Sequence, residues 1–264
     1  MSRKALPWLF LGLKDPMGLW RLSLAIGPGE AKGERRMQSP HDNLLHSIHN
    51  YNISVKTREI YLHGNYSQDE FDPGIEFRMA TTFIKNLQLL DSQNHNGILV
   101  YAHTAGGSWI DGMAIYNAIR FIKSPVTFIV YGQATSMSAI ILQAADLRIL
   151  TSDCEFMIHH GEFSIESTST AAQSAVEVNN KNCKRMLEVL AIRAIKSKYF
   201  KERDYTQSQI ERYIDKTIKS KGDWYIVPRD AVDYGFADGI LGDTKYNTLD
   251  KLKYDKKTII KPQK

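Results

Sequence analysis

The sequence predicts an α/β protein in which helices cover a mostly parallel β-sheet. Three segments repeat the same order, a short apolar run typical of a buried strand and then a helix, which is buried in the third repeat. The connections between the repeats are short, and parallel strands require crossovers of this kind. With 264 residues, 43% of them hydrophobic and 24% charged, the chain is long enough to bury one substantial core.

Glycine-containing breaks separate the second and third strands from their helices. The breaks lie at 105–108 and 132–136, at the carboxyl ends of the strands. Because ligands bind beyond these ends in parallel sheets, we expect the two breaks to be neighbours at a site. The strands are expected at 57–64, 97–102 and 125–131, and their helices at 75–90, 109–122 and 139–145.

Further along, the pattern predicts two more strands and two more helices. The strands are expected at 147–150 and 154–159, and a Ser/Thr-rich loop (164–170) follows them. The long helical region from about 170 to 200 has only a partial apolar face, and a second one covers about 206 to 219. We therefore expect the long helix to project from the core, where it can pack against another subunit.

The N-terminal region lacks this periodicity. An apolar stretch at 5–13 imitates a signal peptide, but Lys14-Asp15-Pro16 interrupts it, and it is too short to span a membrane. Glycine and charged residues dominate 27–36, ahead of Met37 as an alternative start. We expect removal of 1–36 to leave folding and activity intact. The chain is divided into a poorly structured leader (1–55), a folded domain (56–243) and a basic tail (244–264).

Composition argues against several classes of function. The formal net charge of +5 is modest and the last lysines lack interleaved aromatic residues, so we interpret the tail as solvated and expect no nucleic-acid partner. Cys154 and Cys183 have neither metal-ligand spacing nor disulfide density, which favours a reducing, cytoplasmic compartment. The sequence contains no P-loop, dinucleotide fingerprint or metal-ligand cluster, so we expect no cofactor.

The most informative stretch is Gly132-Gln133-Ala134-Thr135-Ser136-Met137. It places Ser136 at a strand-to-helix turn, which presents the side chain while the free N–H groups of the helix start face any negative charge that forms nearby. The structural alternative is that Ser136 only caps the buried helix.

A reactive serine needs a base, and the base needs an orienting acid. His159 ends a predicted buried strand and is expected at the same sheet edge, with His160 as a rival base. For the acid we select Asp223, because a carboxylate between Gly222 and a short apolar run can be partly buried and fixed. The alternatives, typical of surface or capping positions, are Asp153, Asp230 and Asp233.

Four segments, in the same order along the chain, share residues with a known family. They are Ala105-Gly106-Gly107-Ser108 with 112–116, the turn at 132–137, the strand at 156–159, and 223–235. Together they resemble the proteolytic subunit of the Clp protease, a self-compartmentalised serine peptidase. The resemblance spans roughly Ile60 to Leu241, with alanine at 105 in place of the family's proline.

This resemblance implies a ClpP/crotonase-like α/β fold and acyl transfer by a Ser-His-Asp triad. Ser136 would attack the peptide carbonyl, His159 would take and return the proton, and Asp223 would orient the imidazole. Backbone N–H groups of Gly107 and Met137 would hold the oxyanion. The resemblance also implies a homo-oligomer of stacked heptameric rings, polypeptide substrates, no membrane association, and a separate AAA+ unfoldase that alone uses ATP.

Two departures from the family pattern bear on partners. The stretch from His159 to Asp223 is longer than usual, and 37–55 lacks the family's N-terminal pore-loop sequence. Divergent copies of this kind resemble those carried by phages, where a related peptidase matures capsid proteins. Whether a Clp-type ATPase docks is therefore open.

Three other functions compete with this interpretation. A crotonase-type acyl-CoA hydratase or isomerase has a similar fold and oxyanion hole but needs no Ser–His pair. A catalytically silent assembly subunit would keep the triad residues in a misaligned arrangement. A Ser–Lys dyad, as in the signal peptide peptidase, would have to use Lys123 or Lys181, and neither stands in a recognisable dyad context.

Overall fold

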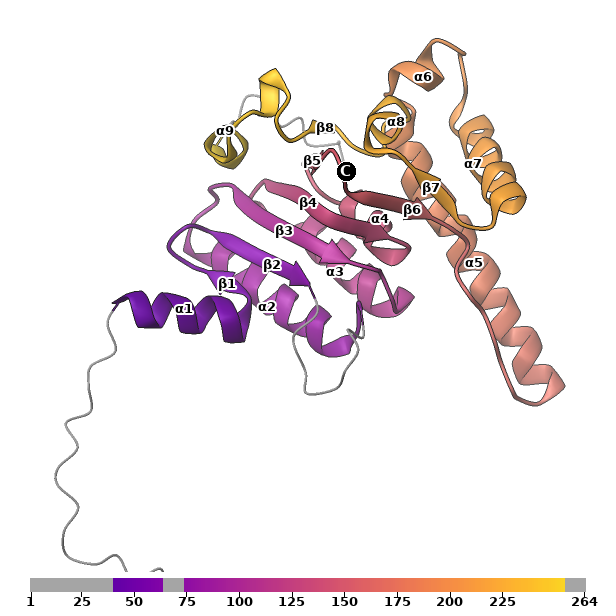
Figure 1. The fold of residues 1–264 in the computed structure, drawn as a ribbon. Helices are drawn as coiled ribbons and strands as arrows, with labels where there is room; N and C mark the ends of the chain where they lie inside the picture. The colour runs from indigo at the N-terminus through magenta and orange to yellow at the C-terminus, as the bar shows by residue number, and fades with distance from the viewer. Residues whose placement is uncertain (1–39, 64–73, 255–264) are drawn as a thin grey trace, which may run out of the picture. The chain divides into compact units, whose positions relative to one another are not determined.

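The computed structural model describes residues 40–63 and 74–254. The segment 1–36, which we expect to be dispensable, and the last ten residues of the predicted tail lie outside the described residues. Within the described part, strands and helices alternate along the chain as expected (Figure 1).

A mixed eight-stranded sheet forms the centre of the fold, and its main path runs β1-β2-β3-β4-β5-β8. All pairs from β2 to β8 on this path are parallel, whereas β1 pairs antiparallel with β2. β6 branches off β4 in parallel and pairs antiparallel with β7. The predicted α/β class with a mostly parallel sheet is confirmed. The strands are Ile53–Ser54 (β1), Glu59–His63 (β2), Ile98–Thr104 (β3), Val126–Thr135 (β4), Leu147–Leu150 (β5), Glu155–Ile158 (β6), Trp224–Ile226 (β7) and Gly239–Ile240 (β8).

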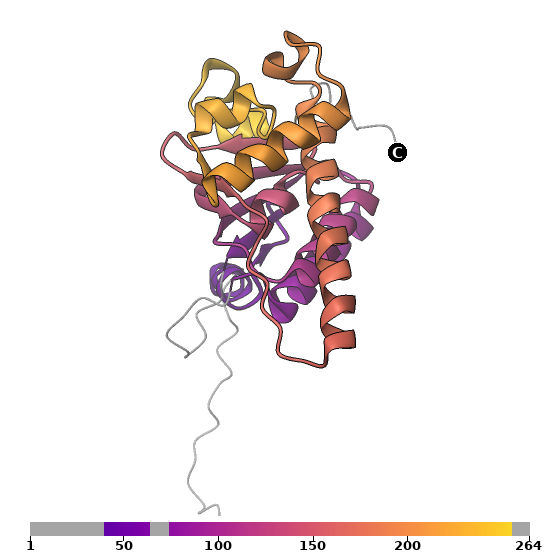
Figure 2. The same ribbon diagram turned by 90° about the vertical axis from the view of Figure 1, so that its right-hand side faces the viewer.

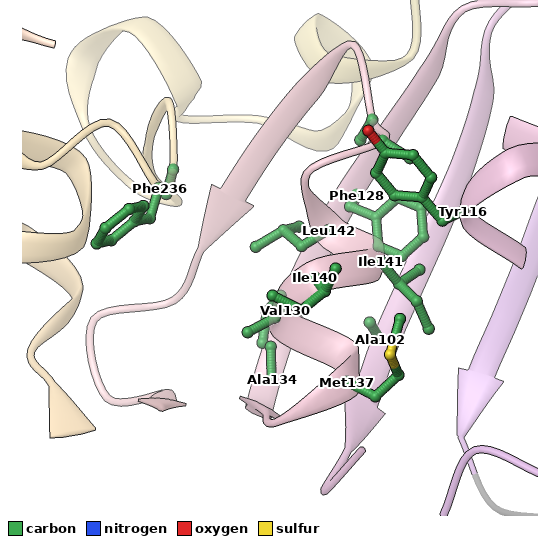
Figure 3. Packing of buried hydrophobic residues seen from close by; sticks show 14 of the residues in the cluster. Ala102, Tyr116, Phe128, Val130, Ala134, Met137, Ile140, Ile141, Leu142 and Phe236 are labelled. Atoms are coloured by element: carbon green, nitrogen blue, oxygen red, sulfur yellow. The ribbon is translucent and has the colours of Figure 1, made fainter. Parts of the chain in front are cut away.

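Helices pack on both faces of this sheet. The larger core joins the face that carries Val100 and Phe128 to α2, α3 and α4, and Figure 3 shows its packing around α4. The helices are Pro40–Tyr51 (α1), Phe77–Gln93 (α2), Trp109–Phe121 (α3), Met137–Leu142 (α4), Ser169–Ala194 (α5), Lys198–Lys201 (α6), Gln207–Lys221 (α7), Pro228–Asp233 (α8) and Leu249–Tyr254 (α9), with a 3₁₀ turn at Thr244–Tyr246 (η1).

A smaller cluster covers the opposite face of the sheet. Leu99 and Ile129, which alternate with the residues of the larger core, pack there with Tyr246 of η1 and Leu252 of α9. Both of the latter side chains are buried. The first part of the predicted solvated tail therefore folds onto the sheet, because its apolar side chains fall where the strands present an apolar surface.

The described chain also begins before the predicted domain boundary at residue 56. Helix α1 and strand β1 both lie inside the range assigned to the leader, and Ile53 and Ser54 of β1 are buried against β2. The boundaries at 55/56 and 243/244 thus fall within ordered segments. How the chain divides beyond the described residues stays a prediction.

Helix α5 projects beyond the sheet, as its partial apolar face predicted (Figure 2). It ends at Ala194, earlier than expected, because Ser197 caps a separate short helix, α6. The buried side chains of α5 all lie in its C-terminal half: Met186, Val189, Leu190, Ala191 and Ala194.

Candidate active site

Strand β4 is longer than predicted and changes its partners along its length. Residues up to Val130 pair with β3 and β5, whereas Gln133 to Thr135 pair with β6 in place of β5, and Ala134 still pairs with Thr104 of β3 after a register shift. The change occurs around Gly132, where any side chain would collide with the ring of His103. Glycine at this point accommodates the register shift against β3 and lets the C-terminal end of β4 exchange β5 for β6.

Ser136 stands at the turn from β4 into α4. Its backbone has φ 55° and ψ −125°, a conformation that non-glycine residues adopt rarely and that is typical of strained functional turns. The side chain makes no capping hydrogen bond to α4, so capping is not its role here. The Ser136 N–H donates to the carbonyl of Met157 on β6 at 2.9 Å. All six residues of α4 are buried, so the packing of this helix in the core fixes the turn that carries Ser136.

The two glycine-containing breaks lie against each other, as expected. Gly106 has φ 95°, and a Cβ there would lie 2.6 Å from the Thr135 carbonyl oxygen and 2.8 Å from the Met137 nitrogen. Thr135 Oγ1 donates to the Ala105 carbonyl at 2.8 Å, and Ser138 Oγ donates to the Thr104 carbonyl at 2.8 Å. Only glycine permits this close approach, so the position of Ser136 relative to the first break is tightly determined.

Hydrogen bonds join Ser136, His159 and Asp223 in a line. Ser136 Oγ lies 2.8 Å from His159 Nε2, and His159 Nδ1 lies 2.9 Å from Asp223 Oδ1. The β6–β7 ladder accounts for the second contact, because its last pair is Ile158 with Trp224 and the next residues along it are His159 and Asp223. The side chain of His159 is 20% exposed and that of Asp223 is 52% exposed, more open than the partly buried carboxylate we expected.

The alternative residues have other contacts. His160 lies 3.1 Å from Asp215 of α7 through its Nε2, and Asp153 accepts a hydrogen bond from Ser152. Asp230 and Asp233 lie on α8. Sequence reasoning missed Asp215, since a carboxylate on the polar side of an amphipathic helix carries no signal that distinguishes it from a solvated residue.

Two backbone N–H groups beside Ser136 are predicted to receive negative charge, those of Gly107 and Met137. The bridge between Ile75 and Gly107 uses the Gly106 carbonyl and the Ser108 N–H, which leaves the Gly107 N–H out of that ladder. Met137 is the first residue of α4, so its N–H has no partner within the helix. Gly107 and Met137 line the same cleft as Ser136.

This cleft has a volume of about 440 Å³ and opens over the serine. A cleft of this size has room for a side chain and its peptide group. Its apolar lining residues are Trp109, Met137, Ile140 and Met186, and its polar lining includes His160, Glu162, Asn179, Asn182 and Cys183.

The described residues contain no group of three or more His, Cys, Asp or Glu side chains arranged to hold a metal ion. Both cysteines are free thiols. Burial raises the pKa of Cys154 to about 11, so this thiol is protonated and inert at neutral pH. Within the same ranges, no helix has the length and apolar character to cross a membrane.

Comparisons with known proteins point to one family. Residues 47–244 match the model of a family described as Clp protease. The ATP-dependent Clp protease proteolytic subunit of Deinococcus radiodurans is 32% identical over 176 residues, which cover 66% of this chain and 79% of the relative. That of Ligilactobacillus salivarius is 30% identical over 198 residues, covering 74% and 88%. The solved structure of a ClpP1 mutant from Listeria monocytogenes is similar in fold, with a TM-score of 0.57 and 20% identity over 75% of this chain and 96% of the other.

Proposed function

We propose, from the premise that this chain belongs to the Clp protease family, that Ser136, His159 and Asp223 are the catalytic residues of its peptidase site. The chain is a serine-type peptidase of the Clp proteolytic subunit type. The observation that carries the residue assignment is the line of hydrogen bonds from Ser136 Oγ through the His159 imidazole to Asp223, with 2.8 and 2.9 Å between the atoms.

The proposed reaction is acyl transfer from a peptide to Ser136. His159 Nε2 accepts the proton as Ser136 Oγ attacks the peptide carbonyl, and it later returns the proton to the leaving amine. Asp223 holds the proton on Nδ1 and stabilises the imidazolium that forms. The Gly107 and Met137 N–H groups bind the oxyanion, and each such donor typically lowers the barrier by about 3 kcal/mol.

The match to the Clp protease family does not favour an acyl-CoA hydratase or isomerase. A silent assembly subunit is also less well supported, because its triad would have to be misaligned and the hydrogen bonds of the Ser136–His159–Asp223 line are short.

Family membership implies ring-forming oligomers that work with Clp ATPases. We propose more specifically that two heptameric rings of this chain stack in the cytoplasm, with the exposed N-terminal half of α5 between them. Polypeptides are the substrates, and ATP acts only through an AAA+ unfoldase, with no cofactor in the peptidase itself.

Labelling with a fluorophosphonate probe, together with hydrolysis of a short fluorogenic peptide, tests the assignment of the serine. We expect Ser136→Ala in the full chain to lose both labelling and hydrolysis. Ser152→Ala, which changes an exposed serine, is the matched control and should keep both. Equal labelling of Ser136→Ala and wild type would remove Ser136 from the mechanism.

A further inference from the structure

A second histidine–aspartate pair lies directly beside the proposed triad. His160 Nε2 is 3.1 Å from Asp215 Oδ1, and both side chains are largely covered, with 26% and 29% exposed. The other oxygen of Asp215 accepts a hydrogen bond from Lys219 Nζ at 2.7 Å, but the Lys219 side chain is 67% exposed. The better-protected of the two contacts of Asp215 is therefore the one to His160.

Both pairs connect the same two segments of the chain. The two histidines are consecutive and follow β6, while the two acids come from α7 and from the residue that precedes β7. Helix α7 ends at Lys221, the C-cap residue Gly222 turns the chain with a φ of 73°, and Asp223 comes next. A movement of α7 relative to the end of β6 would therefore change the His160–Asp215 and the His159–Asp223 contacts together.

The residues that follow His160 do little to hold the end of β6 in place. Residues 161–170 are all exposed, so they contribute almost no packing. Cys183 of α5 contributes one weak contact, an Sγ–H bond to the His160 carbonyl at 3.8 Å. The Asp223 side chain is itself 52% exposed, so the solvent competes for its bond to His159.

We propose that His160 is a positioning residue, which through Asp215 holds the end of β6 against α7 and so keeps His159 in line between Ser136 and Asp223. This inference rests on the proposed function, because it gives His160 a role only if His159 is the base. A displacement of about 1 Å in a catalytic group typically costs up to 10²-fold in rate, and a support beyond the groups that react is the usual means of preventing it.

Asp215 allows a clean test, because it lies behind His160 and is not among the described residues that line the cleft. In the full-length, assembled protein, we expect Asp215→Ala to lower kcat for a short fluorogenic peptide about tenfold, with little change in KM. Lys219→Ala removes the other contact of Asp215 and should have the kcat of the wild type. Wild-type kcat in Asp215→Ala, or an equal loss in Lys219→Ala, would overturn the proposal.

Variants of His160 separate the polar contact with Asp215 from the volume of the side chain. His160→Ala should lose about as much kcat as Asp215→Ala, whereas His160→Gln keeps a donor for Asp215 and should recover most of it. The double variant with alanine at both positions should be no slower than either single variant, since the two residues act as one unit. A glutamine variant as slow as the alanine variant, or additive losses in the double variant, would contradict this.

Two further measurements distinguish the failure of this proposal from other failures. Ser136→Ala is assayed in parallel, and if it keeps full activity the proposed function fails. If Ser136→Ala is inactive while Asp215→Ala is as fast as wild type, only the role of His160 fails. Particle size and thermal unfolding of Asp215→Ala should match wild type, and a loss of kcat that follows dissociation or unfolding would overturn the positioning role.

Discussion

The two halves of the candidate site are built differently. The nucleophile half lies in the core, where Ser136 stands between β4 and the fully buried helix α4, and where Gly106 touches the turn. The base and the acid lie at the edge of the sheet, where His159 and Asp223 extend the short β6–β7 ladder and are partly open to solvent.

A buried network strengthens this contrast. Gln143, at the C-terminal end of α4, accepts a hydrogen bond from Arg148 Nη1 at 2.6 Å, and Arg148 pairs with Asp238 at 2.6 Å. Gln143 also donates to the carbonyls of Ala139 and Phe236. The position of the serine is thus determined by packing that also stabilises the fold, whereas the alignment of the imidazole depends on a few contacts at the surface. Mutations in the first half should change stability and activity together, and mutations in the second should change activity alone.

The largest effect is expected for Asp223→Asn. Loss of the carboxylate leaves the imidazole in the wrong tautomer, which costs about 10⁴-fold in kcat in a serine protease triad. Because the Asp223 side chain is half exposed, the thermal midpoint should change little. Peptide hydrolysis and calorimetry on the same preparation check this, and a large drop in midpoint would contradict the independence of the edge half from the core.

Gly106→Ala should lower both the stability of the fold and the kcat for peptide hydrolysis. The new Cβ would lie 2.7 Å from Ser136 Cβ and closer still to the Thr135 carbonyl oxygen, and the φ of 95° is strained for any L residue. We expect a loss of about 3 kcal/mol of stability and about 10²-fold in kcat. Gly242→Ala has a similar φ of 102° in open space, so it measures the strain alone. An active, stable Gly106→Ala protein would show that the turn is less constrained than its packing indicates.

Lowering the pH should reduce the stability of the nucleophile half, because Asp238 becomes protonated. Burial favours a higher pKa for this carboxyl, but the charge of Arg148 and its hydrogen bonds outweigh burial and lower the pKa. The folded-state pKa then lies below the unfolded value of about 3.9, so the contribution is complete above that value and is lost as the pH falls through the folded-state pKa.

Asp238→Asn should therefore lower the free energy of unfolding by about 1.5 kcal/mol at pH 7 and by less at pH 3. Urea unfolding at the two pH values measures the difference. A deficit that is the same at both would show that the charge of Asp238 is not the source of its contribution.

Thr206→Ala should give the smallest effect, because it changes the start of α7, away from the side chains that align the imidazole. Thr206 and Gln209 form a capping box at the start of α7, and loss of such a cap costs about 1 kcal/mol. The cap lies at the far end of α7 from Asp223, so kcat should stay at the wild-type value while the urea midpoint falls. A parallel fall in kcat would mean that fraying of α7 reaches the acid.

Periodicity along the chain was enough to predict most of the fold. The apolar runs of the strands and the helical spacing in α2 and α3 are local signals that survive in the structure. The extension of β4 beyond Gly132 was not predictable in this way. It depends on pairing with β6, which lies about 20 residues further along the chain, and local periodicity does not report such a pairing. Nor was the docking of η1 and α9, since Tyr246, Leu249 and Leu252 are too few and too close together in the sequence to give a periodic apolar pattern.

The candidate site divides along similar lines. Ser136, His159 and Asp223 were identified from four short segments in order, which act as a joint signal, and the structure brings their side chains into contact. Their catalytic roles stay a proposal. The exposure of Asp223 and the pair of His160 with Asp215 depend on how α7 lies against β6, and no spacing in the sequence encodes that relation.

The amide of Ser136 donates to the carbonyl of Met157, two positions before His159. The nucleophile and its base, far apart along the polypeptide, are therefore linked by one main-chain bond across neighbouring strands. In a chain in which β4 and β6 have not yet paired, Ser136 lacks its proposed proton acceptor, His159. Under the proposed assignment, reactivity therefore arises only together with correct pairing of β4 and β6, and a nascent or half-unfolded copy should not cleave the proteins around it.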